Sequence, residues 1–452
     1  MPAKRILSAA LALLLASSFA APSGVRSASD AGFEYTVADG VATVTGCTST
    51  CPVNLVIPMA LGGYDVRRIG VAAFADKNLA SVSIPFFVTS IGDYAFVANF
   101  LGSVKLPDYL VTIGVGAFAH NSITSVAIPY GVTSIGASVF YNNALAAVRL
   151  NSNLNSIGAA AFARNALTSV SIPNSVETIG SSAFFSNGLT FLKIGTSVKT
   201  IGETAFYDNN LTSLVIPNSV TSVDMGAFMF NDLTSLTLST SMTAIASSAF
   251  AENALTSVSI PPSVETIGNG AFSDNLLSTL VIPGNVDAVD EYAFSRNALT
   301  SVSFLGDAPT AGNNVFSENA GLTAISRLNS ASGWSGTWSG VSVVIVDARA
   351  TATVKPTVTG TSTVGKTLTA ANGTWAGYPT PTFTYQWYAC TKAVSAASST
   401  VPATCKKITG ATKRTFKLTS AQRGKYVAVL VKGTSLRTAA TTWLSTTTAK
   451  VK

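Results

Sequence analysis

One phenylalanine returns every 22 residues along most of this chain, and this period decides what the chain can fold into. A compact domain with one core needs no such period, whereas a stack of similar coils needs one large side chain at the same place in each coil. The period therefore predicts a solenoid and directs the search for function towards its surface. The phenylalanines are Phe74, Phe96, Phe118, Phe140, Phe162, Phe184, Phe206, Phe228, Phe250, Phe272, Phe294 and Phe316.

Within one coil, residues 167–188 read LTSVSIPNSVETIGSSAFFSNG. Val170 and Ile172 alternate with serines, which predicts a short strand with the apolar side chains facing the core. Pro173 has no N–H to donate to a sheet, so it ends this strand and begins a turn. Gly180 is expected to allow a tight bend, and Phe184 completes the core.

An asparagine stands three residues after the phenylalanine in eleven of the twelve coils, and Lys77 takes its place in the remaining one. Such a row could bind a ligand, or it could satisfy backbone groups left unpaired where each coil turns sharply. We expect the structural role. The asparagines are Asn99, Asn121, Asn143, Asn165, Asn187, Asn209, Asn231, Asn253, Asn275, Asn297 and Asn319.

The repeated motif LTSVSIPxSVxxIGxxAFxxN resembles the BspA-like leucine-rich repeat family of bacterial surface proteins over roughly residues 66–325. The resemblance implies a leucine-rich-repeat solenoid with no catalytic activity. It also implies an adhesin or surface receptor that binds host or matrix proteins or other cells.

The amino terminus is typical of a secretory signal peptide, residues 1–20. A basic start at Lys4 and Arg5 precedes an apolar run over residues 6–16, and small residues precede the expected cut between Ala20 and Ala21. A membrane span is the alternative, but this run is about half of the ~20 residues that a helix needs to cross a bilayer. We therefore expect an exported protein without a transmembrane segment in its mature chain.

The solenoid is expected to carry a cap at each end, because an end coil has no neighbour to cover its apolar face. Residues 31–65 form the predicted amino-terminal cap, with a β-hairpin turning at Asp39-Gly40. Residues 66–344 form the predicted solenoid, whose carboxy-terminal lid contains Trp334 and Trp338.

A second domain is predicted after a linker at residues 345–355, because the 22-residue period ends there. Residues 356–452 show short alternating strands, typical of a small β-sandwich. The motifs GTW, YQW, ITGAT and GKYVAV resemble bacterial Ig-like surface modules, with Trp387 as the core tryptophan. Gln422 and Arg423 depart from that pattern, which usually has an acidic residue there. The expected fold class is mainly β: a solenoid of about 11–12 coils of 22 residues, followed by this Ig-like sandwich.

The four cysteines fall into two local pairs, Cys47 with Cys51 and Cys390 with Cys405. Each pair can close a short loop as a disulfide in an oxidising compartment. Cys47 and Cys51 could instead form half of a metal site, but the chain has one histidine and no cysteine pair nearby. We expect two disulfides, no metal and no cofactor.

Charge is divided unevenly along the chain. Residues 21–344 hold 11 basic and 20 acidic residues, a balance of −9, whereas residues 345–452 hold 15 basic residues and one acid, a balance of +14. Opposite signs suggest domains with different neighbours. The segment Lys406, Lys407, Lys413, Arg414 and Lys417 is the candidate contact with an anionic surface; a merely solvated strand region is the alternative.

Catalytic chemistry finds little support in the sequence. His120 is the only histidine, so a two-histidine metal site cannot form, and no second Ser-His-Asp set can exist. It occupies a slot that tolerates many polar residues, so we expect it at the surface. Counting residues leaves a pair of acids for glycoside hydrolysis as an alternative, but the only adjacent pair, Asp290 and Glu291, is explained by a solvated turn. We expect no enzyme.

The outward positions of the predicted strands are mostly Ser, Thr, Ala or Val. Lys105, Arg149, Phe191 and Lys193 stand out as bulky or charged, and we expect them to form a ligand-contact patch; the alternative is that they only keep the surface soluble. The favoured function is a secreted or surface-associated binding protein, without a covalent anchor. Its expected partners are a protein or glycan on another cell or matrix and an anionic cell-wall polymer, with no nucleic acid. A structural envelope protein and a carbohydrate-active enzyme are the alternatives.

Overall fold

The computed structural model describes residues 26–328, 330–346, 350–376, 381–435 and 441–452. The signal peptide expected at residues 1–20, and residues 347–349 of the expected linker, lie outside the described residues. The chain divides into two compact units. The first runs to Thr300 and includes Pro309–Leu322; the second comprises Ser301–Ala308 and Thr323–Lys452.

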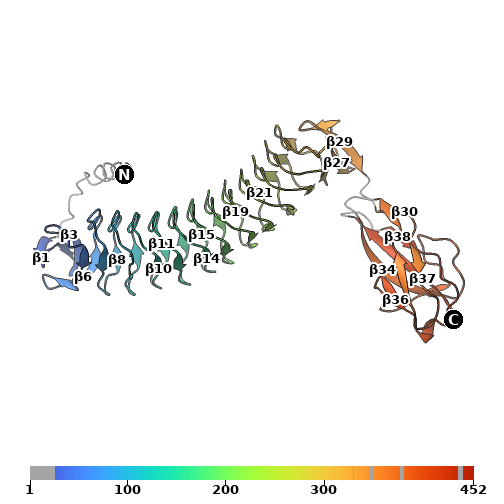
Figure 1. Cartoon of the computed structure of the whole chain (residues 1–452), viewed down its shortest axis with the longest axis horizontal. Helices are drawn as coiled ribbons and strands as arrows, with labels where there is room; N and C mark the ends of the chain where they lie inside the picture. Colours follow the sequence, from blue (N-terminus) through green and yellow to red (C-terminus); the bar gives the residue numbers. More distant parts are fainter. Residues whose placement is uncertain (1–25, 329, 347–349, 377–380, 436–440) are drawn as a thin grey trace. The chain divides into compact units, whose positions relative to one another are not determined.

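The first unit is a row of stacked coils, as the phenylalanine period predicts (Figure 1). Coils contribute short strands that pair in parallel with a shift of one repeat, so that Ser171 lies opposite Lys193. Except for the first, Asn54–Val56, which lies within the expected cap, these are the strands expected from the alternation of apolar residues and serines. They are β4 (Asn54–Val56), β7 (Ser81–Ser83), β10 (Ser125–Ala127), β12 (Ala147–Arg149), β14 (Ser169–Ser171), β16 (Phe191–Lys193), β18 (Ser213–Val215), β20 (Ser235–Thr237) and β23 (Thr279–Ile282).

The coils also form a second row of parallel strands, which was not expected from the sequence. Each of these strands contains a dipeptide such as Ser-Ile or Thr-Ile, or a similar pair. Most of these strands have only two residues, such as Thr178–Ile179, and the isoleucine faces the core. The row comprises β6 (Tyr64–Ile69), β8 (Ser90–Ile91), β9 (Thr112–Ile113), β11 (Ser134–Ile135), β13 (Ser156–Ile157), β15 (Thr178–Ile179), β17 (Thr200–Ile201), β19 (Ser222–Val223), β21 (Ala244–Ile245), β22 (Thr266–Ile267), β24 (Ala288–Val289) and β26 (Thr310–Ala311).

The periodic phenylalanines form a continuous stack inside the solenoid. The ring of Phe184 lies 5.3 Å from that of Phe162 and 5.3 Å from that of Phe206, with the ring planes nearly parallel. All three side chains are fully buried. Stacked rings bury a large apolar area and set the distance between coils, so the period of the sequence is the period of the core.

The asparagine row has the structural role expected from the sequence. The side chain of Asn209 accepts a hydrogen bond from the backbone N–H of Leu189 at 3.1 Å. Its Nδ2 donates to the carbonyl oxygens of Phe184 and Phe206, each at 3.1 Å. One amide therefore joins two coils and satisfies backbone groups that the turn would leave unpaired.

The turn that carries each phenylalanine has an unusual backbone. The residues two before and two after each phenylalanine have a positive φ, as at Ser182 and Ser186, and only three of these positions hold glycine. This geometry directs backbone N–H groups to the next coil: Ser182, Phe184 and Ser186 donate to Glu203, Ala205 and Tyr207 at 2.8–2.9 Å. Coil-to-coil hydrogen bonding therefore continues through a turn without strand conformation.

Gly180 has a different role from the predicted one. Its φ lies outside the left-handed range, but a Cβ at this position would lie 2.7 Å from the backbone nitrogen of Ala159. The glycine is therefore needed for the close approach of two coils, rather than for a bend that only glycine can make.

The amino-terminal cap contains the predicted hairpin. β2 (Phe33–Ala38) and β3 (Val41–Cys47) pair antiparallel, and β1 (Arg26–Asp30) adds a strand that the sequence analysis did not identify. β3 then pairs in parallel with β6, and Phe33 meets the edge of Phe74 at 6.3 Å. A further pair is made by β5 (Ala60–Leu61) with β6. The hairpin thus covers the first ring of the phenylalanine stack.

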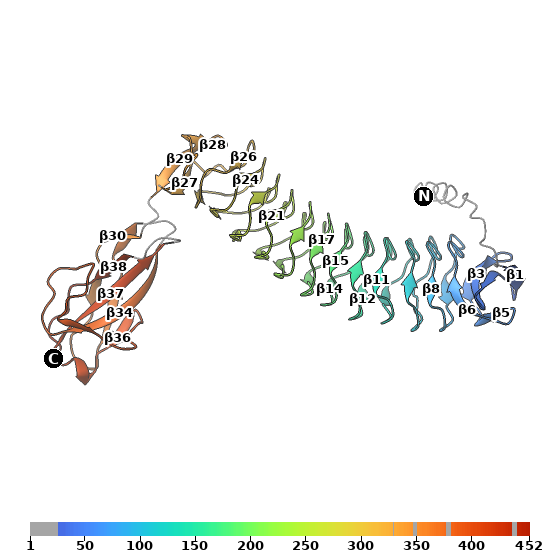
Figure 2. The same cartoon turned by 180° about the vertical axis from the view of Figure 1, so that it is seen from behind.

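The second unit contains β-sheets (Figure 2), and its described residues also include one short helical turn. Phe304 packs against the rings of Trp334 and Trp338, each at 4.9 Å. Further along, Trp387 is fully buried, as predicted, in a core with Leu368 and Val429. The elements are β25 (Ser301–Phe304), β27 (Ala324–Leu328), β28 (Thr337–Trp338), β29 (Val341–Val346), β30 (Thr351–Val354), β31 (Thr357–Thr359), β32 (Thr367–Ala371), β33 (Thr374–Ala376), β34 (Thr382–Cys390), β35 (Cys405–Lys407), β36 (Thr415–Lys417), η1 (Ser420–Gln422), β37 (Tyr426–Thr434) and β38 (Thr441–Leu444).

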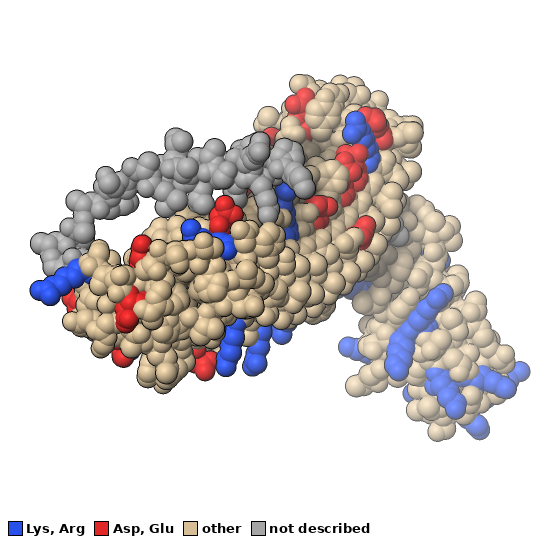
Figure 3. Space-filling model, turned by 60° about the vertical axis from the view of Figure 1, so that its left-hand side comes forward, with Lys and Arg blue, Asp and Glu red and all other residues tan. Residues whose placement is uncertain are grey.

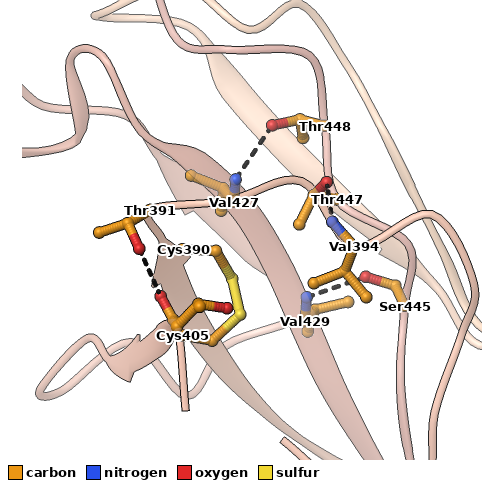
Figure 4. The surroundings of a disulfide bond; sticks show 10 residues. Cys390, Thr391, Val394, Cys405, Val427, Val429, Ser445, Thr447 and Thr448 are labelled. Carbon is orange, nitrogen blue, oxygen red and sulfur yellow. Dashed lines mark hydrogen bonds between the residues drawn. A yellow bond between two sulfur atoms is a disulfide. The ribbon is translucent and has the colours of Figure 1, made fainter. Parts of the chain in front are cut away.

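Both disulfides are present as predicted. Cys47 bonds to Cys51 after β3, and Cys390 bonds to Cys405 between the paired strands β34 and β35. Figure 4 shows the second disulfide beside β37, whose Val429 N–H donates to the buried Oγ of Ser445 at 3.0 Å. The predicted mainly-β fold, a solenoid of stacked 22-residue coils with a further sheet region, is confirmed.

Candidate binding face

The strands of the solenoid place alternate side chains on one continuous surface. In β14, Val170 is buried while Ser169 and Ser171 are exposed, because successive side chains of a strand point to opposite sides. We call the exposed positions of β7, β10, β12, β14, β16, β18 and β20, with the matching segment around Lys105, the strand face. Parallel pairing without slippage stacks equivalent positions into columns that run from coil to coil.

Lys105, Arg149 and Lys193 fall in one such column, each two coils from the next. Arg149 ends β12 opposite Ala127, and Lys193 ends β16 opposite Ser171. Lys105 is exposed in the coil before β10, in a segment without strand conformation. We call these three residues the cation column. Phe191 is exposed by 55% and begins β16, in the other column of the strand face.

A groove of 860 Å³ brings two of the four predicted contact residues together. Its lining comes from three successive coils, at residues 104–106 and 108, 125–130 and 147–152, and includes Lys105 and Arg149. Ala127, the small residue between them in the column, also lines the groove. Phe191 and Lys193 are not among the lining residues, so the predicted patch divides into this groove and a separate part on β16.

Aromatic side chains beside the groove were missed by the sequence analysis. Phe86, Tyr109 and Tyr130 lie in three successive coils, within two residues of the turn proline, and are 49%, 61% and 69% exposed. Tyr130 lines the groove itself, and Tyr109 lies 6.3 Å from the ring of Phe87. The sequence carries this signal as PFF, PDY and PYG, where the equivalent segments of later coils, such as PNS at residues 173–175, have no aromatic residue.

The basic residues of the cation column are available for an external anion. Among the described residues, no carboxylate forms an ion pair with Lys105, Arg149 or Lys193. One acidic side chain, Asp108, contributes to the lining of the groove. Figure 3 shows Lys and Arg side chains projecting from a solenoid surface that is largely uncharged.

The basic segment of the second unit crosses between two sheets. Lys406 and Lys407 lie on β35, which pairs with β34, whereas Lys417 lies on β36, which pairs with β32. Lys413 and Arg414 lie between these strands, and all five residues are exposed. The segment is fixed from within: the Lys413 carbonyl accepts a hydrogen bond from Trp387 Nε1 at 2.9 Å.

The surroundings of His120 are those of a half-buried surface residue. Its Nδ1 lies 3.0 Å from Nδ2 of Asn142, the residue at the equivalent place in the next coil. Partial burial, followed by the positive charge of Arg164, lowers the pKa of His120 below its ordinary value. Over the part of the chain that the structure describes, no three His, Cys, Asp or Glu side chains gather in a way that could hold a metal ion.

Acidic side chains form a short ladder in the last coils of the first unit. Arg296 lies 3.5 Å from Asp274 and 3.1 Å from Glu318, one coil to each side. Glu252 stands in the same row, and its pKa is raised by burial and then by the charge of Asp274. These four residues occupy equivalent positions of successive coils, so the ladder belongs to the repeat.

A search of the described residues finds no helix with the length and apolar character needed to cross a bilayer. Among the described residues, the strand face between residues 104 and 152 combines a groove with cations that form no ion pair.

The repeats match a known protein family. The family described as BspA type leucine rich repeat region matches at residues 67–190, 155–276 and 199–323. These overlapping matches together span residues 67–323, which is more than half of the 452 residues. No curated protein matches the chain.

Several solved structures are similar. The pneumococcal vaccine antigen PcpA is 21% identical, with 67% of this chain and 87% of PcpA covered and a TM-score of 0.48. A leucine-rich cell surface protein from Faecalibacterium prausnitzii is 22% identical, with 72% and 98% covered and a TM-score of 0.40. A leucine-rich repeat protein from Bacteroides ovatus is 18% identical, with 73% and 77% covered and a TM-score of 0.41. The family match over residues 67–323, with the stacked 22-residue coils, shows that this chain belongs to the BspA-type leucine-rich repeat proteins.

Proposed function

We propose that this protein is a secreted or cell-surface binding and adhesion protein, and that the strand face of its solenoid recognises a protein or glycan ligand. The observation that carries the proposal is the groove of 860 Å³ that contains Lys105 and Arg149. A concave surface with a few converging polar groups is the usual form of a ligand site. Membership of the BspA-type family supports a binding role.

The charges on this face favour recognition over mere solubility. A surface cation that serves only solubility does not need to lie in a groove. Such a cation can also form ion pairs with neighbouring coils, as Arg296 does with Asp274 and Glu318. Lys105 and Arg149 have no such partner among the described residues, and they share one concave surface. An anionic or polar ligand would meet both without first displacing an ion pair.

Export is the second part of the proposal. We propose that residues 1–20 are removed as a signal peptide and that the protein works outside the cell. Two closed disulfides and no free cysteine among the described residues support an oxidising compartment.

The third part concerns the carboxy-terminal region. We propose that residues 345–355 are a linker, that residues 356–452 are an Ig-like β-sandwich, and that its basic surface associates with an anionic cell-wall polymer. The buried Trp387 and the exposed Lys406, Lys407, Lys413, Arg414 and Lys417 support this. Such attraction weakens with salt, because the screening length falls from ~10 Å at 0.1 M to ~3 Å at 1 M.

Binding of the full-length protein to intact cells and extracellular matrix tests the main proposal. Wild type is compared with the double variant Lys105→Ala/Arg149→Ala and with Lys199→Ala, which removes an exposed cation outside the strand face. The double variant is expected to lose most binding, and Lys199→Ala to retain it. Equal binding by all three proteins would contradict the assignment of the strand face. If none of the three bound to cells or matrix, a structural envelope role would be favoured.

Wall association needs a separate variant. The full-length protein with its five basic residues changed to Gln, at positions 406, 407, 413, 414 and 417, is compared with wild type on isolated cell walls. Wild type should bind at low salt and elute as salt rises, whereas the variant should elute earlier. Elution of both proteins at the same salt would rule this segment out as the wall contact.

A further inference from the structure

The cation column has a regular spacing that defines the kind of ligand it fits. We propose that the ligand of the strand face is an unbranched acidic polysaccharide, which lies across the coils and carries a carboxylate on every second sugar. This inference rests on the proposed function and specifies the ligand class of the same surface.

The spacing comes from the repeat. Neighbouring strands lie ~4.8 Å apart, so side chains two coils apart are about 10 Å apart. Lys105, Arg149 and Lys193 follow this rule at intervals of 44 residues. The positions between them hold Ala127 and Ser171, which leave space between the cations. A straight polymer with one negative charge per disaccharide matches this pattern, because two sugars of an extended chain span a similar length.

The groove supplies a second, independent match. Ser125, Ala127 and Ala147 are small lining residues, so a flat ring can approach the backbone between the two cations. Tyr130 forms part of the lining, and Tyr109 and Phe86 continue the line of exposed aromatic side chains into the two preceding coils. Aromatic faces pack well against the apolar faces of sugar rings, while the guanidinium of Arg149 can hold a carboxylate with paired hydrogen bonds. An acidic glycan would contact the aromatic side chains with its sugar rings and the guanidinium with its carboxylate.

Other polyanions fit less well. A nucleic acid carries one phosphate per ~3.4 Å of each strand, about three times more densely than the cation column, so most phosphates would meet Ser, Ala or Val. A protein ligand would be favoured by a cluster of large apolar anchors at the centre of the face. On the strand face, the exposed large apolar residues Phe191 and Val215 lie on β16 and β18, away from the groove. Tyr130 is the one aromatic side chain in the lining of the groove, so no such cluster forms there.

The test uses full-length protein in which the five basic residues of the 406–417 segment are changed to Gln, so that binding at the second unit does not mask the solenoid. Binding is measured by calorimetry with three probes. A hyaluronan oligosaccharide has a carboxylate on every second sugar, an oligogalacturonate has one on every sugar, and a chitooligosaccharide has none. The proposal predicts tightest binding to the hyaluronan oligosaccharide and none to the uncharged probe.

A register variant separates spacing from charge. Arg149→Ser combined with Ser171→Arg keeps the composition and net charge of the strand face but moves the middle cation by one coil. Losing one charge-assisted contact should weaken hyaluronan binding about ten-fold, whereas Arg149→Lys at the original place should retain most of it. Circular dichroism checks that each variant is folded, and Lys193→Ala provides a second, single-site measure of the same column.

The possible outcomes distinguish a failure of the proposed ligand class from a failure of the proposed function of the strand face. Equal binding of hyaluronan by wild type and the register variant would overturn the spacing argument. If hyaluronan does not bind, yet Lys105→Ala/Arg149→Ala loses cell binding, the face is right and the ligand class is wrong. If the three cations affect neither hyaluronan nor cell binding, the proposed function of the strand face fails as well. Preference for oligogalacturonate would show that charge density, and not alternate spacing, governs recognition.

Discussion

At the scale of single residues, a few side chains carry the repeat, and Phe184 is typical of them. It is fully buried, with parallel ring neighbours at 5.3 Å on both sides. Its removal would open a cavity that its neighbours cannot fill without breaking their own stacking, because protein interiors are close-packed.

Phe184→Ala should therefore lower the free energy of unfolding by about 3–5 kcal/mol, the usual cost of truncating a buried ring. Ser171→Ala, in the same coil but exposed, should change it by less than about 0.5 kcal/mol. Urea unfolding followed by far-UV circular dichroism measures both. Small and equal effects would contradict the stacked core.

Asn209 tests the role of the asparagine row. Without its side chain, the Leu189 N–H and the carbonyls of Phe184 and Phe206 lose a partner inside the solenoid. Asn209→Ala should cost at least about 2 kcal/mol, because an unpaired buried polar group costs about 1–3 kcal/mol. The adjacent Asn210 is exposed, and Asn210→Ala should cost little in the same assay. A tolerated Asn209→Ala would leave the row open to a ligand role.

His120 gives a dependence on pH. Its pKa is lowered in the folded protein, by burial and then by Arg164, so below about pH 6.5 the unfolded chain binds the proton more readily than the folded one. Stability is therefore lost as the pH falls through this range. His120→Asn keeps a residue type that accepts the positive φ at this position, and it should lose less stability than wild type between about pH 7 and about pH 5.5. Parallel thermal-melt curves for the two proteins would show that His120 does not contribute.

At the scale of elements, the strands were only partly predictable. Val170 and Ile172 alternate with exposed serines over enough positions to reveal β14, and the 22-residue period fixed how such strands stack. Thr178–Ile179 is too short to show alternation, so the second row of strands stayed hidden. The positive φ at positions such as Ala160 and Arg164 also leaves no trace, because these residue types rarely adopt it.

The candidate site was also only partly predictable from the sequence. Equal spacing places Lys105 and Arg149 in one column from sequence alone, because parallel coils stack equivalent positions. The groove depends on how the turn after each strand folds back, and Tyr130 enters its lining from that turn. The 22-residue period predicts which residues share a column, but it does not predict that a groove lies between them.

The strands β34 and β35 are joined by the Cys390–Cys405 disulfide. Closing a loop of this length stabilises a fold by about 3 kcal/mol through the entropy of the unfolded chain. All five tryptophans lie between Trp334 and Trp443, so tryptophan fluorescence monitors the second unit alone. Cys390→Ala/Cys405→Ala should lower the urea midpoint by fluorescence. An unchanged midpoint would mean that the sheet holds this loop closed without the disulfide.

At the scale of the whole molecule, two surfaces differ in charge. Residues 21–344 carry −9, yet the strand face of the solenoid presents unpaired cations, while residues 345–452 carry +14. The net charge of +7 would suggest one uniformly basic protein. Divided along the chain, it instead suggests a selective binding face on one part and a less selective anionic-surface contact on the other.

The central claim is that ligand meets the strand face, and site-specific photocrosslinking tests it most directly. A photoreactive amino acid is placed at Ser171, which lies in the cation column, or at Ser181, which is exposed elsewhere in the same coil. Full-length protein bound to cells or matrix is then irradiated, and covalent adducts are detected on gels and by mass spectrometry. The account predicts adducts from position 171 and few or none from position 181. Adducts from position 181 alone would place the ligand on another face of the solenoid and contradict the account.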